Sequence, residues 1–266
     1  MATTRPSGIG RQYDGAMENQ ADKQRVSKAW ERLAQAYADS RQVSADKLIE
    51  WPAQLRLAGE FRGKQVLDVG CGTGDKARFF AENGAASVIG VDPSGGFSKQ
   101  WSQHEECLTL QLVQGSFENL HSLPALQGRK FDLVVCFQAL MYAGNLDATV
   151  KTLAGLLLPD GALVFSVPHP FRFAILKNEM EGWGHGLAYQ QTQPYRYPSP
   201  WNPEVYLEHA MPRVSDYLNA IASANLRLAS CEEPCVTDEF RAISPAKSAW
   251  MDRYVGIVVF RAEVEG

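Results

Sequence analysis

Short apolar runs alternate with amphipathic segments through the middle of the chain. Five runs have the length of buried strands, near residues 65–69, 87–91, 108–113, 131–137 and 162–167. Three segments between them show helical periodicity, near residues 75–83, 94–104 and 145–157. Because strands that alternate with helices build a parallel sheet covered on both faces, the pattern predicts an α/β fold with a doubly wound sheet.

Two helical patterns precede the first strand. Residues 1 to about 20 are polar and lack periodicity, whereas apolar residues between Ala21 and Ser40 fall on one helical face. A second helix is predicted to begin with Ser44 as its N-cap, and Pro52 should bend or divide it. We therefore expect an N-terminal arm and cap helices over residues 1–60, followed by a cofactor-binding domain over residues 61–266.

The segment from about 168 to 212 differs from the rest in composition. It holds seven prolines together with six tryptophan and tyrosine residues. It is too apolar for a solvated linker and too irregular for a pair of helices, so it predicts a lid over the substrate, inserted after the fifth strand. The alternative is a flap that only covers the core. A helix over 214–224 and strands near 226–232 and 254–262 are predicted to follow.

Composition and charge exclude several classes of partner. The formal net charge is −4 and no block of lysine or arginine occurs, so a nucleic-acid backbone is not an expected partner. The chain has no apolar run of about eighteen residues and begins with a polar segment, so a membrane span and a secretory signal are not expected either. We expect a cytoplasmic protein with reduced cysteines and no metal site, since Cys231 and Cys235 have no second pair at ligand spacing.

A glycine turn follows the first predicted strand. Gly70, Gly72 and Gly74 supply a turn without side chains, and Asp92 ends the next strand about twenty residues later. An acidic side chain at that place can accept protons from both ribose hydroxyls. Asp75 stands where the dinucleotide fingerprint needs a third glycine or alanine, which disfavours a nicotinamide cofactor. The pattern therefore predicts a different cofactor of the nucleoside type.

The stretch Val66-Leu-Asp-Val-Gly-Cys-Gly-Thr-Gly74 resembles motif I of the class I S-adenosylmethionine-dependent methyltransferases, and Val91-Asp-Pro-Ser94 resembles motif II. Later segments keep the order of that family, at residues 115–118, 131–136 and 156–161. Within the family the chain looks most similar to the small-molecule, type 11-like branch. The resemblance implies a Rossmann-like, mostly parallel sheet of seven strands, whose last two strands form an antiparallel pair.

The same resemblance implies S-adenosylmethionine as cofactor, S-adenosylhomocysteine as product, and a set of cofactor contacts. Asp92 would bind the ribose, and Asp68 would orient the turn or reach the methionine ammonium through water. Ser116 stands where many members carry an acid that accepts from the adenine amino group. Backbone approach, the sides of the adenine ring and the remaining contacts would come from Gly70, Cys71, Gly72, Gly74, Pro93, Phe117, Tyr37 and Gln138.

Methyl transfer from a sulfonium is an in-line displacement, so alignment in a dry pocket matters more than covalent catalysis. His169 is the best candidate for a general base because it directly follows the fifth strand. A histidine that caps the strand end is an equal alternative. Tyr142 and then Tyr13 of the N-terminal arm are the next candidates for the base. The expected substrate contacts come from the predicted lid and its far end: Phe171, Trp183, Trp201, His209 and Arg213.

These features predict methyl transfer to a small organic molecule, with oxygen, nitrogen or carbon as the acceptor atom. No aspartate-rich site for a divalent ion is evident, and Cys136-Phe-Gln-Ala139 stands where DNA base methyltransferases carry an Asn/Asp-Pro-Pro-aromatic run. Two alternatives remain open at this point: a class I fold used for a non-methyl reaction, and a cofactor-binding regulatory subunit without turnover. The sequence also leaves open whether the protein forms homo-oligomers.

Overall fold

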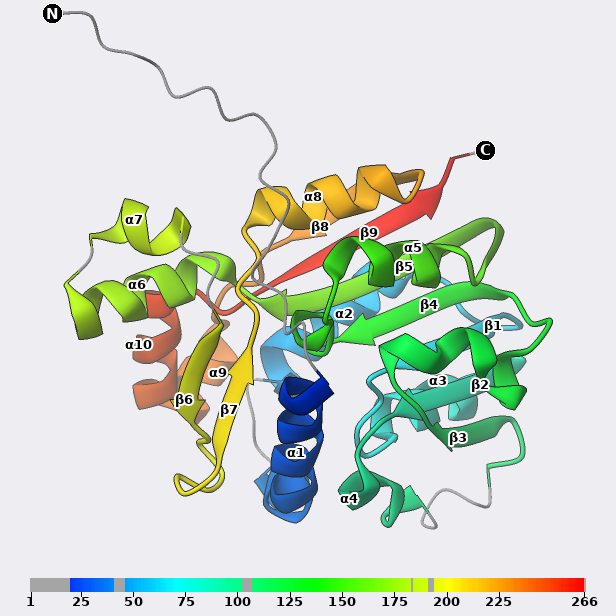
Figure 1. Cartoon of the computed structure of the whole chain (residues 1–266), viewed down its shortest axis with the longest axis horizontal. Coiled ribbons are helices and arrows are strands. Elements are labelled where there is room, and N and C mark those ends of the chain that lie inside the picture. Colours follow the sequence, from blue (N-terminus) through cyan, green and yellow to red (C-terminus); the bar gives the residue numbers. More distant parts are fainter. Residues whose placement is uncertain (1–19, 41–45, 102–106, 183, 191–193, 266) are drawn as a thin grey trace, which may run out of the picture.

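A sheet of seven strands forms the centre of the molecule in the computed structural model, which describes residues 20–40, 46–101, 107–182, 184–190 and 194–265 (Figure 1). The strands lie in the order β3-β2-β1-β4-β5-β9-β8. β9 runs antiparallel to its neighbours β5 and β8, and the pairings among β1 to β5 are parallel. The predicted seven-stranded, mostly parallel sheet is thus confirmed. Its strands are β1 (Gln65–Val69), β2 (Ser87–Asp92), β3 (Leu110–Gln114), β4 (Phe131–Phe137), β5 (Leu157–Pro168), β8 (Leu226–Glu232) and β9 (Ile257–Val264).

Helices cover both faces of the sheet, as the alternation of strands and helices requires. One apolar core lies between the sheet and the helices α5 (Leu146–Ala154) and α8 (Val214–Ser223). The other core lies between the opposite face and the helices α2 (Trp51–Ala58) and α3 (Asp75–Glu82). Phe165 of β5 and Phe260 of β9 stack at 4.9 Å between ring centroids. The central strands read as continuous apolar runs because both of their faces are buried.

The N-terminal helices follow the sequence prediction closely. α1 (Gln20–Ser40) is a single helix, and a π-helical turn, η1 (Asp46–Glu50), leads directly into α2. Pro52 lies in the first turn of α2, where a missing N–H costs nothing, and the chain changes there from the π-helical turn to the α-helix without a break. The predicted N-cap Ser44 lies outside the described residues. The helix expected near 94–104 is shorter than predicted, since α4 is Gly95–Ser98.

The segment after β5 is more regular than its prolines suggest. It forms α6 (Pro170–Glu181), α7 (His185–Gln190) and a hairpin of β6 (Tyr195–Pro198) with β7 (Tyr206–His209). The expectation that it is too irregular for a pair of helices is therefore wrong. Pro170 starts α6 instead of breaking it, because proline fits the first turn of a helix. Two more helices that were not predicted lie between β8 and β9, α9 (Asp238–Ile243) and α10 (Pro245–Tyr254).

These added elements gather at one end of the sheet. Figure 1 shows α6, α7, β6, β7, α9 and α10 together at the end toward which β4 points, with α1 beside β7. The packing of α1 on β7 is formed by Ala29 and Leu33 against Val205 and Leu207. None of the helices in the described residues is long and apolar enough to cross a membrane. Short 3₁₀ helices follow two of the strands. η3 (Phe117–Ser122) and η4 (Pro124–Leu126) follow β3, and η5 (Leu140–Tyr142) follows β4.

Candidate active site

A cavity of about 920 Å³ lies between the sheet and these added elements. Its floor is formed at the carboxyl ends of the parallel strands, by Val69 of β1, Asp92 of β2, Phe137 of β4 and Pro168 of β5. Ligands bind at this edge of doubly wound sheets, because the loops that leave the strands diverge there. The other walls come from α1, α6, the β6–β7 hairpin and the α9–α10 pair.

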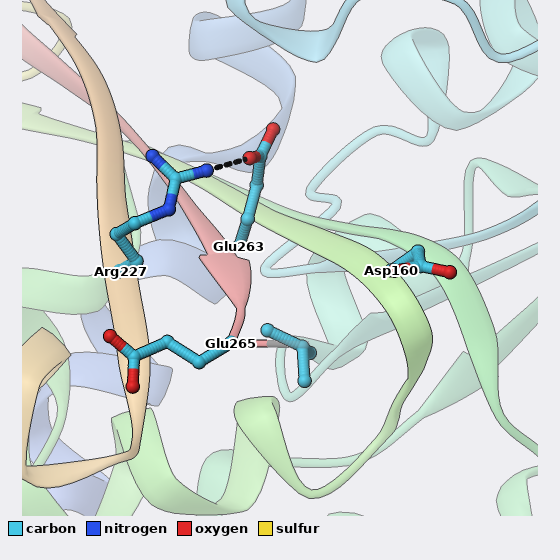
Figure 2. A pocket seen from close by; sticks show the side chains of 5 residues that line it. Asp160, Arg227, Glu263 and Glu265 are labelled. Carbon is cyan, nitrogen blue, oxygen red and sulfur yellow. Dashed lines mark hydrogen bonds and ion pairs between the residues drawn. The ribbon is translucent and has the colours of Figure 1, made fainter.

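A second pocket of about 530 Å³ lies elsewhere, where β5 begins, β8 begins and β9 ends. Figure 2 shows its charged side chains, with Arg227 bonded to Glu263 at 2.7 Å while Asp160 points away from that pair. The ion pair is exposed, and such pairs stabilise a protein little. Neither the glycine turn nor a predicted site residue lines this pocket, so the cavity at the carboxyl ends is the candidate active site.

The glycine turn brings main chain directly to the cavity. Gly70 and Gly72 line it with φ angles of +80° and +55°. A Cβ atom on Gly70 would lie 2.3 Å from the Cβ of Ala139, so only glycine lets the turn after β1 approach the turn after β4. Cys71 and Gly74 lie outside the cavity. Cys71 is buried against Gly90 of β2, and Gly74 caps the start of α3.

Asp92 is buried at the cavity floor and held by two backbone groups. Its Oδ2 accepts a hydrogen bond from the Gly72 N–H, and its Oδ1 accepts one from the Ser94 N–H, both at 2.9 Å. Burial raises the pKa of Asp92 to about 6, and the two hydrogen bonds limit this rise. Each oxygen keeps lone pairs for a further donor, which fits a ribose diol. Asp68 is also buried, within β1 rather than in the cavity wall.

The predicted adenine end is assembled from β2 and η3. Pro93, Ser116 and Phe117 all line the cavity, as the resemblance implied. Glu118 lines it too, which supplies a carboxylate two residues beyond the serine that replaces the usual acid. Glu118 belongs to one of the motif matches in the sequence, so that match already contained the signal.

Gln138 reaches the cavity through an unusual backbone conformation at the end of β4. Its φ of +56° is rare outside glycine, and its N–H donates to the Ser166 carbonyl at 2.9 Å. The Ser166 hydroxyl also accepts from Gln54 Nε2 at 2.9 Å, and Gln54 Oε1 accepts from Lys76 Nζ at 2.8 Å. This buried chain of hydrogen bonds fixes the turn that carries Gln138.

An aromatic cluster closes the middle of the cavity. Tyr37 of α1 meets Trp201 of the β6–β7 loop edge to face at 4.9 Å, and Trp30 lies 5.6 Å from the same ring. The Tyr142 hydroxyl is hydrogen bonded to Trp30 and to Tyr197. Burial raises the pKa of Tyr142 well above its ordinary value and that of Tyr197 to about 12, so both hydroxyls stay protonated. Tyr37, Tyr142 and Trp201 are thus brought together in the cavity as predicted site residues.

The predicted base His169 lies outside the cavity. Its Nδ1 accepts a hydrogen bond from the Phe171 N–H at 3.1 Å, and its Nε2 lies 2.8 Å from Glu233 Oε1. Both ring nitrogens therefore have protein partners. The histidine thus has a capping role, as the alternative expected, but it caps the start of α6 and not the end of the fifth strand.

Three of the predicted substrate contacts also lie outside the cavity. Phe171 is exposed beside Tyr189, and Arg213 pairs with Asp216 at the start of α8. His209 is buried behind Tyr142 and Tyr197, with its Nδ1–H donating to the Ala210 carbonyl at 2.7 Å. Burial lowers the pKa of His209 to about 4, so it stays neutral. The remaining predicted residues, Tyr13 and Trp183, lie outside the described residues.

Sequence reasoning missed the far wall of the cavity, which includes Arg172 and Leu176 of α6 and Lys247 and Trp250 of α10. These two helices are far apart in sequence and carry no motif, so only the fold brings them together. Within the described ranges, no group of three or more His, Cys, Asp or Glu side chains is placed to hold a metal ion.

Comparison with known proteins agrees with this geometry. A family model described as a methyltransferase domain matches residues 39–228, which is most of the chain. An uncharacterised protein of Haemophilus influenzae is 29% identical over 74% of this chain and 80% of its own length. The ubiquinone biosynthesis O-methyltransferase of Neisseria meningitidis is 32% identical, but the match covers only 40% of this chain and 45% of that enzyme.

Solved structures share the fold. A Listeria monocytogenes protein assigned as an S-adenosylmethionine-dependent methyltransferase aligns with a TM-score of 0.69 at 21% identity, over 82% of this chain and 97% of its own. The cyclase SpnF aligns with a TM-score of 0.61 at 15% identity, over 91% and 96%. The glycine turn, the carboxylate of Asp92 with its two backbone hydrogen bonds, and the pocket at the strand ends suit the cofactor of this family. The chain belongs to the class I S-adenosylmethionine-dependent methyltransferases.

Proposed function

We propose that the protein transfers the methyl group of S-adenosylmethionine to a small organic molecule bound in the aromatic part of the cavity. The observation that carries this proposal is that one continuous cavity is lined both by the glycine turn with Asp92 and by Trp30, Tyr142 and Trp201. Pockets for single drug-sized ligands have volumes of roughly 300–1,000 Å³. At about 920 Å³ this cavity lies near the upper end of that range, which leaves space for a small acceptor beside the cofactor.

In this proposal the cavity works by alignment. Asp92 fixes the ribose, the backbone around Gly70 and Gly72 approaches the methionyl part, and Pro93 and Phe117 flank the adenine. The bound cofactor supplies an electrophilic methyl group on a positively charged sulfur. Aromatic ring faces attract cations without forming the strong ion pair that would stabilise the ground state. The rings of Trp30, Tyr37 and Trp201 are therefore suited to hold the reacting groups in line while excluding water.

The described cavity wall contains no histidine that could remove a proton from the acceptor. Tyr142 keeps its proton, so we propose that it orients the acceptor through its hydrogen-bonded hydroxyl rather than acting as a base. An acceptor that ionises readily, such as a phenol with an electron-withdrawing substituent, would need the least help. The relatives named as O-methyltransferases favour oxygen as the acceptor atom, although the chain spans about half the length of those enzymes.

The segment from about 168 to 212 is proposed as a lid for the acceptor. Its hairpin contributes Tyr195, Tyr197 and Leu207 to the cavity wall, and Trp201 at the hairpin loop meets the α1 rings. These aromatic contacts add to the apolar packing of α1 on β7. The likeness to the cyclase SpnF supports one alternative, a non-methyl reaction in the same cavity.

Two measurements on the full chain test the proposal. Calorimetry should detect binding of S-adenosylhomocysteine, and methyl-labelled S-adenosylmethionine should yield a labelled product with members of a panel of phenols, amines and carbon acids. Asp92→Ala should abolish both signals, since it removes two charge-assisted hydrogen bonds worth about 1.5–3 kcal/mol each. Asp147→Ala, an exposed aspartate in the first turn of α5, is the matched control and should behave as wild type. Cofactor binding without labelled product from the panel or from metabolite extracts would reject methyl transfer in favour of the two alternatives.

A further inference from the structure

The far wall of the cavity carries two cations on one aromatic ring. The Arg172 guanidinium of α6 lies 5.5 Å from the centre of the Trp250 ring, and the Lys247 ammonium of α10 lies 4.0 Å from it. Arg172 also lies 5.2 Å from the Phe173 ring. Phe173 is buried, Arg172 and Trp250 are half-buried and Lys247 is exposed, and all four line the cavity.

Arg172 differs in its surroundings from most arginines of the described chain. Seven of them form ion pairs with carboxylates, whereas Arg172 is placed over ring faces in the cavity wall. Burial lowers the pKa of the Arg172 guanidinium, which nevertheless keeps its charge. The partial loss of water around the Lys247 ammonium and the charge of Arg172 lower the pKa of Lys247. Both like charges line the same cavity, and an anion bound beside them would relieve their repulsion.

The acidic groups of the cavity balance only part of this charge. Glu50 of η1 interacts electrostatically with both Arg172 and Lys247, so the cluster of three groups keeps an excess of one positive charge. The other carboxylates of the described cavity wall, Asp92 and Glu118, belong to the predicted cofactor end. The charge excess thus falls on the wall that α6 and α10 form, where the cofactor contacts are not expected.

We propose that Arg172 and Lys247 bind an oxyanion of the acceptor, with a carboxylate on an aromatic ring as the preferred class. Arginine presents a planar fork that matches two carboxylate oxygens, and lysine adds a point charge beside it. The rings of Phe173, Tyr195 and Trp250 provide flat apolar walls for the body of such a molecule. The inference rests on the proposed function, because it concerns the acceptor part of the same cavity.

Holding the acceptor by its anionic end would leave its opposite end directed toward the aromatic cluster and the glycine turn. A neutral analogue would leave the positive charge that Glu50 does not balance without a partner, which is a larger loss than that of an ordinary contact. Specificity would therefore come from charge at α6 and α10, and reactivity from alignment at the strand ends.

The test uses pairs of ligands that have similar shape and differ in charge. Protein saturated with S-adenosylhomocysteine is titrated by calorimetry with 4-hydroxybenzoate, 4-hydroxybenzamide and phenyl phosphate. We expect the carboxylate to bind at least about tenfold more tightly than the amide, because a buried charged partner is worth more than a neutral one. Comparable or tighter binding of phenyl phosphate would assign the site to phosphate esters within the same oxyanion chemistry.

The variants Arg172→Gln, Lys247→Gln and their combination should remove the preference for charge in steps while leaving affinity for S-adenosylhomocysteine unchanged. Arg172→Lys should keep part of the preference, since it keeps the charge and loses only the fork. Arg196→Gln is the matched control, because Arg196 is an exposed arginine on β6 that lies 4.9 Å from the Tyr206 ring outside the cavity. It should behave as wild type.

Equal affinity for the acid and the amide, including binding of neither at millimolar concentration, would overturn the anion site. So would a double variant that binds the cofactor product normally and still prefers the acid. Failure of the proposed function gives a different result, since it would appear in the wild type as lost cofactor binding or absent methyl transfer. Normal affinity of the double variant for S-adenosylhomocysteine shows that it has folded.

Discussion

At the scale of single residues, the ribose contact proposed for Asp92 is linked to an electrostatic cost. Its burial raises its pKa to about 6, and only the ionised form can accept hydrogen bonds from both ribose hydroxyls. Affinity for S-adenosylhomocysteine should therefore be flat above pH 7 and fall as the pH drops through 6. With binding confined to the ionised form, the dissociation constant should be about tenfold larger at pH 5 than at pH 7. Calorimetry across this range measures it.

The matched variant is Asp92→Asn, which is nearly isosteric and does not titrate. It should bind more weakly than wild type at neutral pH and show no change between pH 5 and 7. The amino group and carboxylate of the ligand do not titrate in this range, so they add no slope of their own. Wild-type affinity that is the same at both pH values would remove Asp92 from the ribose site.

His169 provides a second residue-scale prediction. Its Nδ1 caps the first turn of α6 and its Nε2 meets Glu233, so its removal should act on stability. His169→Ala should lower the free energy of unfolding by about 1 kcal/mol, the usual worth of a helix cap, with turnover within a factor of two of wild type. His169→Asn should restore most of that stability, because asparagine is a good N-cap. A hundredfold loss of turnover with normal cofactor binding would instead assign the catalytic base to His169.

At the scale of elements, the seating of α1 on α4 depends on one glycine. A Cβ atom on Gly96 would meet the Glu31 carbonyl oxygen at 2.7 Å and its Cα at 2.8 Å, both of them backbone atoms that cannot move aside. Gly96→Val should therefore displace α1, which carries Trp30 and Tyr37 into the cavity. We expect affinity for S-adenosylhomocysteine to fall at least about tenfold and α1 to become more sensitive to proteolysis.

Gly95→Ala is the matched control for Gly96→Val. Its new Cβ would lie 3.3 Å from the Glu31 carboxylate oxygen and 3.8 Å from Gln114 Nε2, both at the ends of flexible side chains. Affinity and protease resistance should stay close to wild type. If Gly96→Val also behaves as wild type, α1 does not contribute to the cofactor site.

Elements differ in how far the sequence predicts them, and the difference has a physical reason. β1, β2 and β4 are continuous apolar runs that are buried on both faces, so composition alone locates them. α6 and α10 have no clear apolar stripe, and they form where local caps and tertiary contacts favour them. Pro170, at the first turn of α6, contributed to the expectation of an irregular segment, although proline is common at that position.

The site divides in the same way. Gly70, Gly72, Asp92 and Gln138 could be placed from sequence because each lies at or shortly after the end of a strand. Strand ends meet at one edge of a parallel sheet. The residues proposed to bind the acceptor could not be placed in this way. Arg172 and Lys247 come from helices about seventy-five residues apart, and only the fold of the whole chain sets them on the same ring.

At the scale of the whole molecule, the cavity lies between two parts of the protein that we expect to differ in stability. The floor belongs to the sheet, whose central strands are buried and paired on both sides. The opposite wall is built from separate stretches of chain, in α1, α6, the β6–β7 hairpin and the α9–α10 pair, which pack through small apolar clusters. Small clusters open more easily than a large core. We therefore expect this opposite wall to open locally and admit ligands while the sheet stays folded.

Hydrogen exchange can separate these two parts. Saturation with S-adenosylhomocysteine should slow amide exchange in the turn after β1, the end of β2 and the start of η3, by up to about a hundredfold when the ligand is present at a hundred times its dissociation constant. Exchange in α6 and α10 should slow only when 4-hydroxybenzoate is added as well, because their contacts are to the proposed acceptor site. In Asp92→Ala the same concentration of S-adenosylhomocysteine should protect neither part. If S-adenosylhomocysteine alone protects α6 and α10 as strongly as the glycine turn, then the opposite wall of the cavity closes on the cofactor itself. The acceptor must in that case enter before closure and does not cause it.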